Sequence, residues 1–278
     1  MKITLPVSHI INRDNIGTVP NIDAYQVRTV DGINKIPYDN YKEIIYHDSK
    51  GIVCHDFIDH FINIYIKLAH KKFKLYSTNL MPISEEYSMV DGPSCKYYSC
   101  LNPLKPNELL KRVKYKLKYV RPFADMIALE NGNKYPYYDY EYIFNPKWLK
   151  GALKELDVKF CFDIGHAIVS YNNYFFQKYN RIEDFILDHP LEDVVEVHLS
   201  KPDYSSESAD ITCYDMHEAP GYLEWKLLKL ILPKLNNGVY IAIEYYKEFD
   251  EMLKSYSNLF DIIRSIRQDM CKGRTILV

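Results

Sequence analysis

The sequence predicts a (β/α)8 TIM barrel, an α/β fold of eight parallel strands, that forms a single domain over residues 1–278. Strand-like and helix-like segments alternate along the chain, as in consecutive βα units. Four short apolar runs end in a residue that can bind a metal ion, at the position where parallel barrels carry their chemistry. No repeat, low-complexity stretch or Gly/Ser-rich linker indicates a second domain.

The predicted strands are short runs rich in β-branched and aromatic residues. Seven are clear, and they span residues 3–7, 24–29, 73–78, 126–130, 159–165, 194–200 and 239–246. The segment EIIYHDS at 43–49 would be the eighth strand that a closed barrel needs. The final TILV at 275–278 could instead form an edge segment.

Helices are predicted where apolar residues recur at helical spacing. They span residues 56–71, 108–120, 145–157, 181–188, 222–235 and 251–270. Asn145 and Pro146 form a typical helix start, because a capping side chain is followed by proline in the first turn. The basic run at 111–121 is predicted to be a solvated helix face.

Composition excludes several classes of protein. The chain is 47% hydrophobic and 26% charged with a net charge of −2, so it should form a large core and has no overall basic field for nucleic acid. It contains no apolar stretch of the about eighteen residues that a membrane helix needs, and its N-terminus lacks signal-peptide features. The six cysteines show no CxxC spacing. We therefore expect a cytoplasmic protein with reduced thiols that acts on a small molecule rather than on nucleic acid or a membrane.

The four apolar runs end in Glu130, Asp163, His198 and Glu244. Carboxylates and imidazoles bind hard or borderline divalent cations, so four of them at one end of a barrel predict a metal centre. Of the four, Glu244 is the least ambiguous candidate for a metal ligand, because it follows five apolar residues of a strand that should be buried. An unpaired carboxylate there would be costly or would have a shifted pKa, and a metal ion would remove that cost.

Three further residues could join this centre. Asp163 and His166 are three positions apart in DIGH, and a turn at Gly165 would let both face the barrel mouth. Asp215 and His217 are two positions apart in the loop-like stretch DMHEAP. An extended backbone would let this pair bind one cation, whereas a surface loop with an Asx turn is the alternative.

Other polar residues lie near strand ends. Glu196 precedes His198 by two positions, so it lies either deep in the barrel interior or on a twisted strand. His9, Arg28 and His47 stand near the ends of early strands and could point into the same mouth. The sequence has no GxGxxG, GxxxxGK[ST], HExxH or GxSxG motif, which excludes the common nucleotide-binding, zincin and serine-hydrolase sites.

Taken in order, these motifs resemble the xylose isomerase-like TIM-barrel superfamily. CFDIGHA is similar to its D-x-G-H-A strand end, VEVHLS to its E-x-H-hydrophobic-S strand, and DMHEAPGYLEW to its D-x-H-x-x-P-G loop. The resemblance covers roughly residues 120–250, which would be the metal-binding half of the barrel. The group includes sugar isomerases and epimerases, endonuclease IV-type nucleases and DUF692-type iron enzymes that modify peptides.

The resemblance implies two sets of ligands. The set common to the superfamily comprises Glu130, Asp163, His198 and Glu244. The set that holds another ion in nuclease-like members comprises His166, Asp215 and His217, although His166 contacts substrate in isomerase-like members. The nuclease pattern also needs two early histidines, for which only His47 or His9 could stand in. The arginine that many epimerases carry after the strand-end histidine is absent between Arg181 and Arg264.

We therefore expect a divalent-metal-dependent isomerase or epimerase of a small sugar or sugar-like hydroxy-carbonyl compound. Glu130 and Glu244 would transfer a proton, and His166 would orient a substrate oxygen. The ligand types suit Mn, Mg, Co, Zn and Fe alike. The alternatives are an endonuclease IV-like multinuclear phosphodiesterase, a DUF692-like multinuclear iron enzyme that modifies a peptide, and a barrel without enzymatic activity.

Overall fold

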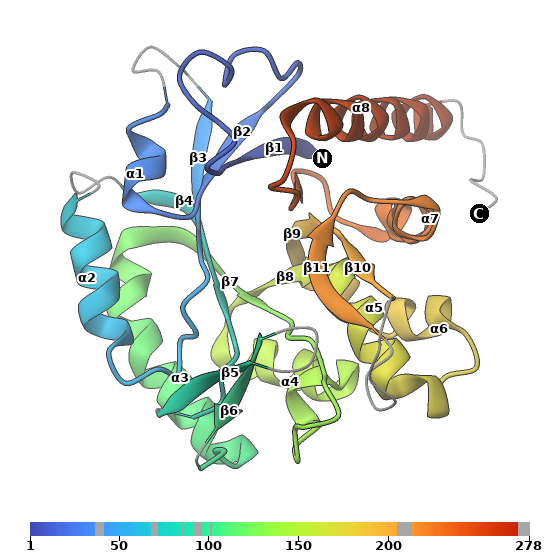
Figure 1. Cartoon of the computed structure of the whole chain (residues 1–278). Helices are drawn as coiled ribbons and strands as arrows, with labels where there is room; N and C mark the ends of the chain where they lie inside the picture. Colours follow the sequence, from blue (N-terminus) through green and yellow to red (C-terminus); the bar gives the residue numbers. More distant parts are fainter. Residues whose placement is uncertain are drawn as a thin grey trace.

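Eight parallel strands close into a barrel, which confirms the predicted fold class (Figure 1). They are β1 (Lys2–Val7), β2 (Ala24–Val27), β3 (Glu43–Asp48), β4 (Phe73–Asn79), β7 (Ala124–Glu130), β8 (Lys159–Asp163), β9 (Val194–Leu199) and β12 (Tyr240–Ile243). Each strand pairs with the next, and β1 pairs with β12. The computed structural model describes residues 1–36, 42–67, 72–84, 86–91, 96–100, 102–204 and 213–271. The segment at 43–49 is thus the third barrel strand, and 275–278 lies outside the described residues.

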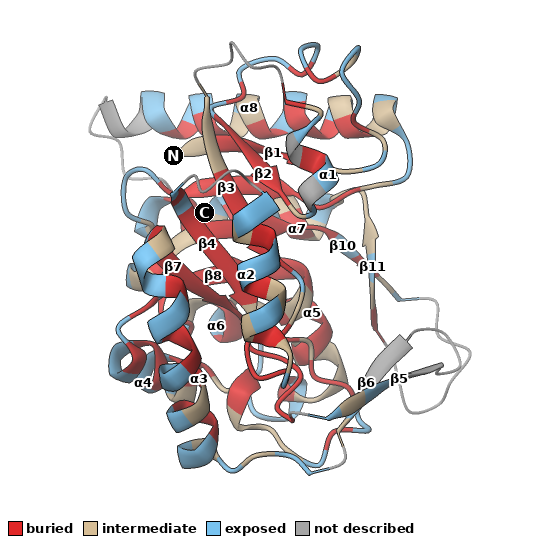
Figure 2. Cartoon of the chain, turned by 90° about the vertical axis from the view of Figure 1, so that its left-hand side faces the viewer, coloured by how far each residue is buried: buried red, intermediate tan, exposed pale blue. Residues whose placement is uncertain are grey.

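Helices surround the strands, and Figure 2 shows buried strands at the centre with exposed helix faces outside. They are α1 (Val30–Ile33), α2 (Phe57–Lys67), α3 (Pro106–Val120), α4 (Pro146–Leu156), α5 (Ile164–Asn173), α6 (Ile182–Leu187), α7 (Tyr222–Ile231) and α8 (Phe249–Cys271). Short 3-10 turns span Arg121–Phe123, Tyr142–Phe144, Phe175–Gln177, Leu191–Asp193 and Leu232–Lys234. The Asn145 side chain caps α4 by accepting a hydrogen bond from Lys147 N at 2.9 Å, as the sequence predicts.

Several predicted elements have the wrong boundaries. The strands expected at 24–29 and 239–246 end earlier, at Val27 and Ile243. The strand expected at 159–165 ends at Asp163, because the Asp163 side chain caps helix α5, which the sequence analysis missed. The helix expected at 222–235 ends at Ile231 and continues only as a 3-10 turn. Pro233 lies in that turn and has no backbone N–H to continue an α-helix.

Two antiparallel ribbons extend from the carboxyl ends of barrel strands, and neither was predicted. One pairs β5 (Tyr87–Asp91) with β6 (Lys96–Cys100), after β4. The other pairs β10 (Lys201–Asp203) with β11 (Tyr214–Glu218), after β9. The second ribbon carries residues 215 and 217, so it brings polar side chains over the barrel.

The barrel interior changes from apolar to polar along the strands. Its lower layer packs the buried side chains of Ala24, Ile45, Leu75, Ala128, Cys161 and Tyr240. Side chains two positions apart on a strand point to the same face. Two positions after five of these six residues, the inward-facing side chains are polar, namely Gln26, His47, Ser77, Glu130 and Asp163. Packing therefore fills the lower interior, and the carboxyl end is left for polar chemistry.

Candidate metal centre

Four acidic or imidazole side chains meet at the carboxyl ends of neighbouring strands. Glu130 ends β7, Asp163 ends β8, His198 lies on β9 and Glu244 follows β12. These strands are adjacent in the barrel, so their ends form one continuous arc. All four residues are buried, with no more than 2% of their surface exposed.

The His198 ring joins the three carboxylates. Its Nδ1 atom lies 2.7 Å from Glu130 Oε1 and 3.3 Å from Glu244 Oε1. Asp163 Oδ2 is 3.9 Å from the same nitrogen. The structure therefore brings together the four strand-end residues that the sequence singled out.

This arrangement fits a divalent cation. Buried carboxylates repel one another unless a cation or a proton joins them. Asp163 Oδ2 has no hydrogen-bond partner among the described residues. Burial, reinforced by the charge of Glu130, raises the pKa of Asp163 to about 6. Ligand atoms of Glu130, Asp163 and His198 lie within 4.8 Å of one another, and they are of the types that hard or borderline cations prefer.

A second group of side chains adjoins the first. His166 Nε2 lies 3.2 Å from Asp215 Oδ2, and His217 Nδ1 lies 3.3 Å from Asp215 Oδ1. His217 Nε2 is also 2.9 Å from Glu244 Oε2, so the two groups are continuous. Asp215 and His217 lie on β11 and not in the loop that their composition indicated. The backbone of His217 is left-handed, with a φ of 49°, a conformation that is uncommon outside functional sites and turns.

The charges of this second group depend on one another. Burial would lower the pKa of His166, but Asp163 and Asp215 raise it well above its usual value. Burial would also lower the pKa of His217, but Asp215 and Glu244 raise it to about 9. Burial would raise the pKa of Asp215, yet the two histidines lower it to about 2. Two imidazolium groups therefore balance the carboxylates, a role that cations would take over if they bound.

Asp163 is also the cap of helix α5. Its Oδ1 accepts a hydrogen bond from His166 N at 2.8 Å, and the Asn131 side chain bonds the Asp163 backbone at 2.8 and 2.9 Å. His166 Nδ1 lies 2.8 Å from Asn131 O, which leaves His166 Nε2 to face the site. Gly165 lies between them in close packing, because a Cβ there would lie 2.5 Å from Ser200 Oγ.

Residues from the first half of the barrel complete the centre. Arg28 follows β2, and its Nη1 lies 2.8 Å from Glu244 Oε1. Burial would raise the pKa of Glu244, but Arg28 and His198 hold it well below its usual range. His47 on β3 is fully buried, with Nε2 3.6 Å from Glu130 Oε2. Both residues had been noted only as candidates near early strand ends.

Glu196 lies deep in the barrel interior, which decides between the two alternatives for this residue. Gln26 Nε2 donates a hydrogen bond to Glu196 Oε1 at 2.7 Å, and Ser77 Oγ lies 3.0 Å from His47 Nδ1. The sequence analysis missed both Gln26 and Ser77, as well as Asn131. Gln26 and Ser77 each lie two positions before a polar strand-end residue, and this spacing could have indicated inward-facing side chains.

Both groups open onto a cavity of about 220 Å³. Its lining residues are Arg28, Ser49, Asn79, Met81, Glu130, Gly132, Asn133, Tyr135, Tyr138, His166, Asp215, His217 and Glu244. His9 is exposed and does not contribute to this lining. The cavity is smaller than the pockets that hold drug-sized ligands, and its polar lining suits a small hydroxylated molecule.

No protein-family model matches the chain, and no curated protein matches it in sequence. Solved structures do match. A D-tagatose 3-epimerase-like protein is 15% identical, with 97% of this chain and 100% of that chain covered at a TM-score of 0.64. L-ribulose 3-epimerase is 9% identical, with 100% and 99% covered at 0.58. A xylose isomerase-like TIM-barrel protein from Mycobacterium smegmatis, solved in complex with magnesium, is 11% identical, with 95% and 97% covered at 0.56.

This chain shares the TIM-barrel fold of these structures. The likeness extends over nearly the whole chain, whereas the sequence motifs covered only residues 120–250. In this TIM barrel, the seven predicted site residues lie in one connected cluster, to which Arg28 and His47 add from outside that range. None of the described helices combines the length and the apolar character needed to cross a membrane.

Proposed function

We propose that this protein is a divalent-metal-dependent isomerase or epimerase of a small sugar or sugar-like hydroxy-carbonyl compound. The observation that carries the proposal is that two buried carboxylates, Glu130 and Glu244, line one small cavity. They come from β7 and β12, which are separated in the barrel by β8 and β9. They can therefore approach a substrate from different sides. The epimerase names of structures with this fold support the same reaction class.

The metal ion would be held by Glu130, Asp163, His198 and Glu244. When bound, it would polarise adjacent carbonyl and hydroxyl oxygens of the substrate as a Lewis acid, which lowers the energy of an enediolate. Asn131 and the α5 cap fix Asp163 in place, so this ligand needs little rearrangement.

Epimerisation requires a base that removes the proton from the carbon next to the carbonyl and an acid that returns a proton to the other face. We assign these two steps to Glu130 and Glu244, which both line the cavity. His166 Nε2 faces the cavity and can donate a hydrogen bond to a substrate oxygen. Burial of the carboxylates excludes bulk water, which strengthens their electrostatic effect.

A multinuclear phosphodiesterase is the second candidate. His166, Asp215 and His217 add nitrogen and oxygen donors beside Glu244, and two neighbouring cations could stabilise the attacking and leaving oxygens of a phosphodiester. The small cavity and the net charge of −2 favour the small-molecule reaction over a nucleic-acid substrate.

The test compares two reactions of the purified protein after it is reloaded with Mn²⁺, Mg²⁺ or Zn²⁺. Interconversion of ketoses that differ at one hydroxyl carbon, with Mn²⁺ or Mg²⁺, supports the isomerase. Cleavage of a phosphodiester model compound with Zn²⁺, and no sugar conversion, supports the hydrolase. Two or three iron ions in the native protein would instead favour oxidative chemistry of the DUF692 type.

The decisive variant is Glu244→Gln, which preserves the shape of the side chain and removes its charge. We expect loss of turnover and weaker metal binding. Glu218→Gln is the matched control, because Glu218 lies on the same ribbon as His217 and does not line the cavity. Full turnover and unchanged metal content in Glu244→Gln would rule out the proposed role of Glu244.

A further inference from the structure

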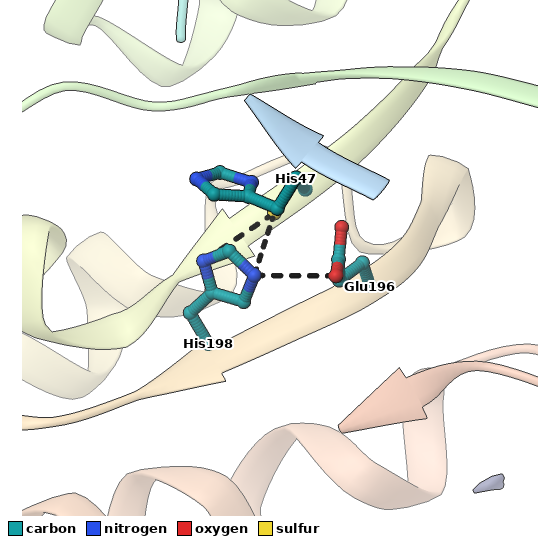
Figure 3. Close-up of side chains that lie close together, drawn as sticks. His47, Glu196 and His198 are labelled. Atoms are coloured by element: carbon teal, nitrogen blue, oxygen red, sulfur yellow. Dashed lines mark hydrogen bonds and ion pairs between the residues drawn. The ribbon is translucent and has the colours of Figure 1, made fainter. Parts of the chain in front are cut away.

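A second cluster of metal-binding side chains lies inside the barrel, on the other side of His198 from the carboxylate arc. It consists of His47 from β3, Cys161 from β8, and Glu196 and His198 from β9. All four are fully buried, and one ligand atom from each lies within 4.8 Å of the others. Figure 3 shows that His47 and Glu196 approach the His198 ring.

Two atoms of this cluster have no hydrogen-bond partner among the described residues. They are Glu196 Oε2 and His47 Nε2, which lies 3.6 Å from Glu130 Oε2, and both belong to fully buried side chains. The other polar atom of each side chain has a partner, since His47 Nδ1 lies 3.0 Å from Ser77 Oγ and Glu196 Oε1 accepts from Gln26. Such outer partners are typical of metal ligands, because they fix the tautomer of the histidine and the orientation of the carboxylate.

The two ring nitrogens of His198 face different sets of ligands. Nδ1 lies 2.7 Å from Glu130 Oε1, in the first centre. Nε2 lies 3.2 Å from Glu196 Oε1, in the inner cluster, and Cys161 Sγ lies beside the ring, 3.6 Å from Nε2 and 3.8 Å from Nδ1. Gln26 Nε2 is also 2.8 Å from His198 Nε2, a contact that a cation would replace. His198 is therefore the residue that the two clusters share.

We propose that the barrel interior binds a second cation through His47 Nε2, Cys161 Sγ, Glu196 Oε2 and His198 Nε2. One thiolate, two imidazoles and one carboxylate form a donor set that suits Zn²⁺ in tetrahedral coordination. The first centre has three carboxylates and one imidazole, and it therefore suits a harder ion such as Mg²⁺ or Mn²⁺. The two centres thus select different metals.

Binding of the inner ion requires two deprotonations. The Cys161 thiol loses its proton to become a thiolate, and the His198 ring loses its remaining proton when both nitrogens are ligands. His198 then bridges the two cations as an imidazolate, and the protons are released to solvent. The inner ion would hold His198 in a fixed orientation for the first centre, independently of which reaction that centre performs.

Cobalt substitution of the full-length protein tests this proposal, because Co²⁺ occupies Zn²⁺ sites and its bond to a thiolate gives a near-ultraviolet charge-transfer band. Cys161 is the thiol in the described cluster, and the first centre has no sulfur ligand. We expect the band in the unmodified protein, and we expect Cys161→Ser to lose the band together with one bound cobalt. Cys54→Ser is the matched control, because Cys54 is equally buried but lies outside the cluster, and it should keep both.

A cobalt-loaded protein without the band, or a Cys161→Ser variant that keeps both the band and its cobalt, would overturn the proposal. Glu196→Gln is a second variant in case Cys161→Ser does not fold, as judged by circular dichroism. It keeps the thiol, and we expect at least roughly tenfold weaker cobalt binding when the band is titrated, since even loss of an outer partner costs 10- to 100-fold. Unchanged binding in this variant would also contradict the proposal.

Asp163→Asn separates the inner ion from the first centre. Asp163 is not in the inner cluster, so this variant should lose the ion of the first centre and keep the charge-transfer band. Loss of the band in Asp163→Asn would contradict an inner ion held by its own four residues. A protein that shows the band but lacks isomerase activity would retain the inner site and reject only the proposed function.

Discussion

The two halves of the barrel contribute different charges to the site, because the later half supplies the carboxylates together with the imidazoles of His166, His198 and His217, whereas the early half supplies one fixed cation. Strands β7 to β12 supply the carboxylates of Glu130, Asp163 and Glu244. Strands β1 to β4 supply the guanidinium of Arg28 and the imidazole of His47. Burial, together with the charges of Arg28 and His198, lowers the pKa of His47 far below its usual value, so this ring is neutral. The later strands thus attract a cation, and the early strands provide one internal counter-charge.

In the proposed metal centre, this difference keeps the buried carboxylates paired before a metal ion binds. Arg28 pairs with Glu244, and His166 and His217 pair with Asp215, so most of the carboxylates already have a partner. An incoming cation must therefore replace existing ion pairs, because these carboxylates are not unpaired charges. Metal affinity should therefore depend on residues from both halves, although only the later half supplies carboxylate ligands.

The largest expected effect comes from the later half. Asp163→Asn keeps a side chain that can cap α5 but removes the charge, so metal binding at the first centre should weaken by more than roughly 100-fold, because loss of an outer partner alone costs 10- to 100-fold. Isothermal titration with Mn²⁺ and circular dichroism would measure affinity and fold separately. Unchanged Mn²⁺ affinity would show that Asp163 is a helix cap only.

The second-largest effect is expected on stability, when the positive charge that Arg28 contributes from the early half is removed. Arg28→Gln removes the guanidinium beside Glu244 Oε1 and leaves this buried carboxylate only its histidine partners, His198 and His217, which should destabilise the metal-free protein by up to about 3 kcal/mol. Added Mn²⁺ should stabilise this variant more than the unmodified protein, because Arg28 no longer competes for Glu244 Oε1. Urea unfolding with and without Mn²⁺ checks both statements, and Arg28→Lys is the control that keeps the charge. Equal stabilisation by Mn²⁺ in the two proteins would contradict the competition.

The later half should also be acid-sensitive at a position away from the site. His189 is buried against Phe162 and Phe185, with ring centroids 4.8 Å from each, and burial lowers its pKa to about 4. Between pH 6.5 and 4 the unfolded chain binds a proton that the folded protein excludes, so stability falls as the pH falls through this range, by up to about 3 kcal/mol.

His189→Gln should remove this part of the pH dependence, because glutamine cannot take up the proton yet retains an N–H donor near Phe185 O. Urea unfolding of both proteins at pH 7, 5.5 and 4.5 provides the measurement. Parallel pH profiles for the two proteins would assign the acid sensitivity to other groups.

The smallest expected effect concerns the close packing of the later strand ends. Gly165→Ala should destabilise the protein by about 1–3 kcal/mol, because its Cβ would lie 2.5 Å from Ser200 Oγ. Ser200→Ala in the same chain should recover part of this loss, since the hydroxyl is the nearest atom. A double-mutant cycle from thermal unfolding measures the coupling, and purely additive effects would exclude this contact as the cause.

The fold could be predicted from the sequence because its evidence is local. Apolar runs and their helical or alternating spacing depend on neighbouring residues only, and they placed all eight barrel strands. Helix α5 was missed because Asp163 looked like the end of a strand, although it is also the cap of the helix. The ribbon of β10 and β11 was missed because its strands are short, three and five residues, and a two-stranded ribbon depends on the pairing between them rather than on a local apolar pattern.

The candidate site could also be predicted only in part, because its residues follow from local pattern but their contacts do not. Glu130, Asp163, His198 and Glu244 could be named from the sequence, because a carboxylate or imidazole at the end of a buried strand is costly without a partner. Which partners they have could not be named. The contact between Arg28 and Glu244 joins residues on β2 and after β12, and the contact between Gln26 and Glu196 crosses the barrel interior.

The sequence by itself therefore determined the barrel, the order of its strands and the four polar strand-end residues of the candidate site, because each follows from local pattern and burial. Only the tertiary structure decided how the charges are balanced and that His198 lies between two clusters of ligands. Barrel closure brings the early and late strands together, and no local pattern specifies which side chains meet when it does.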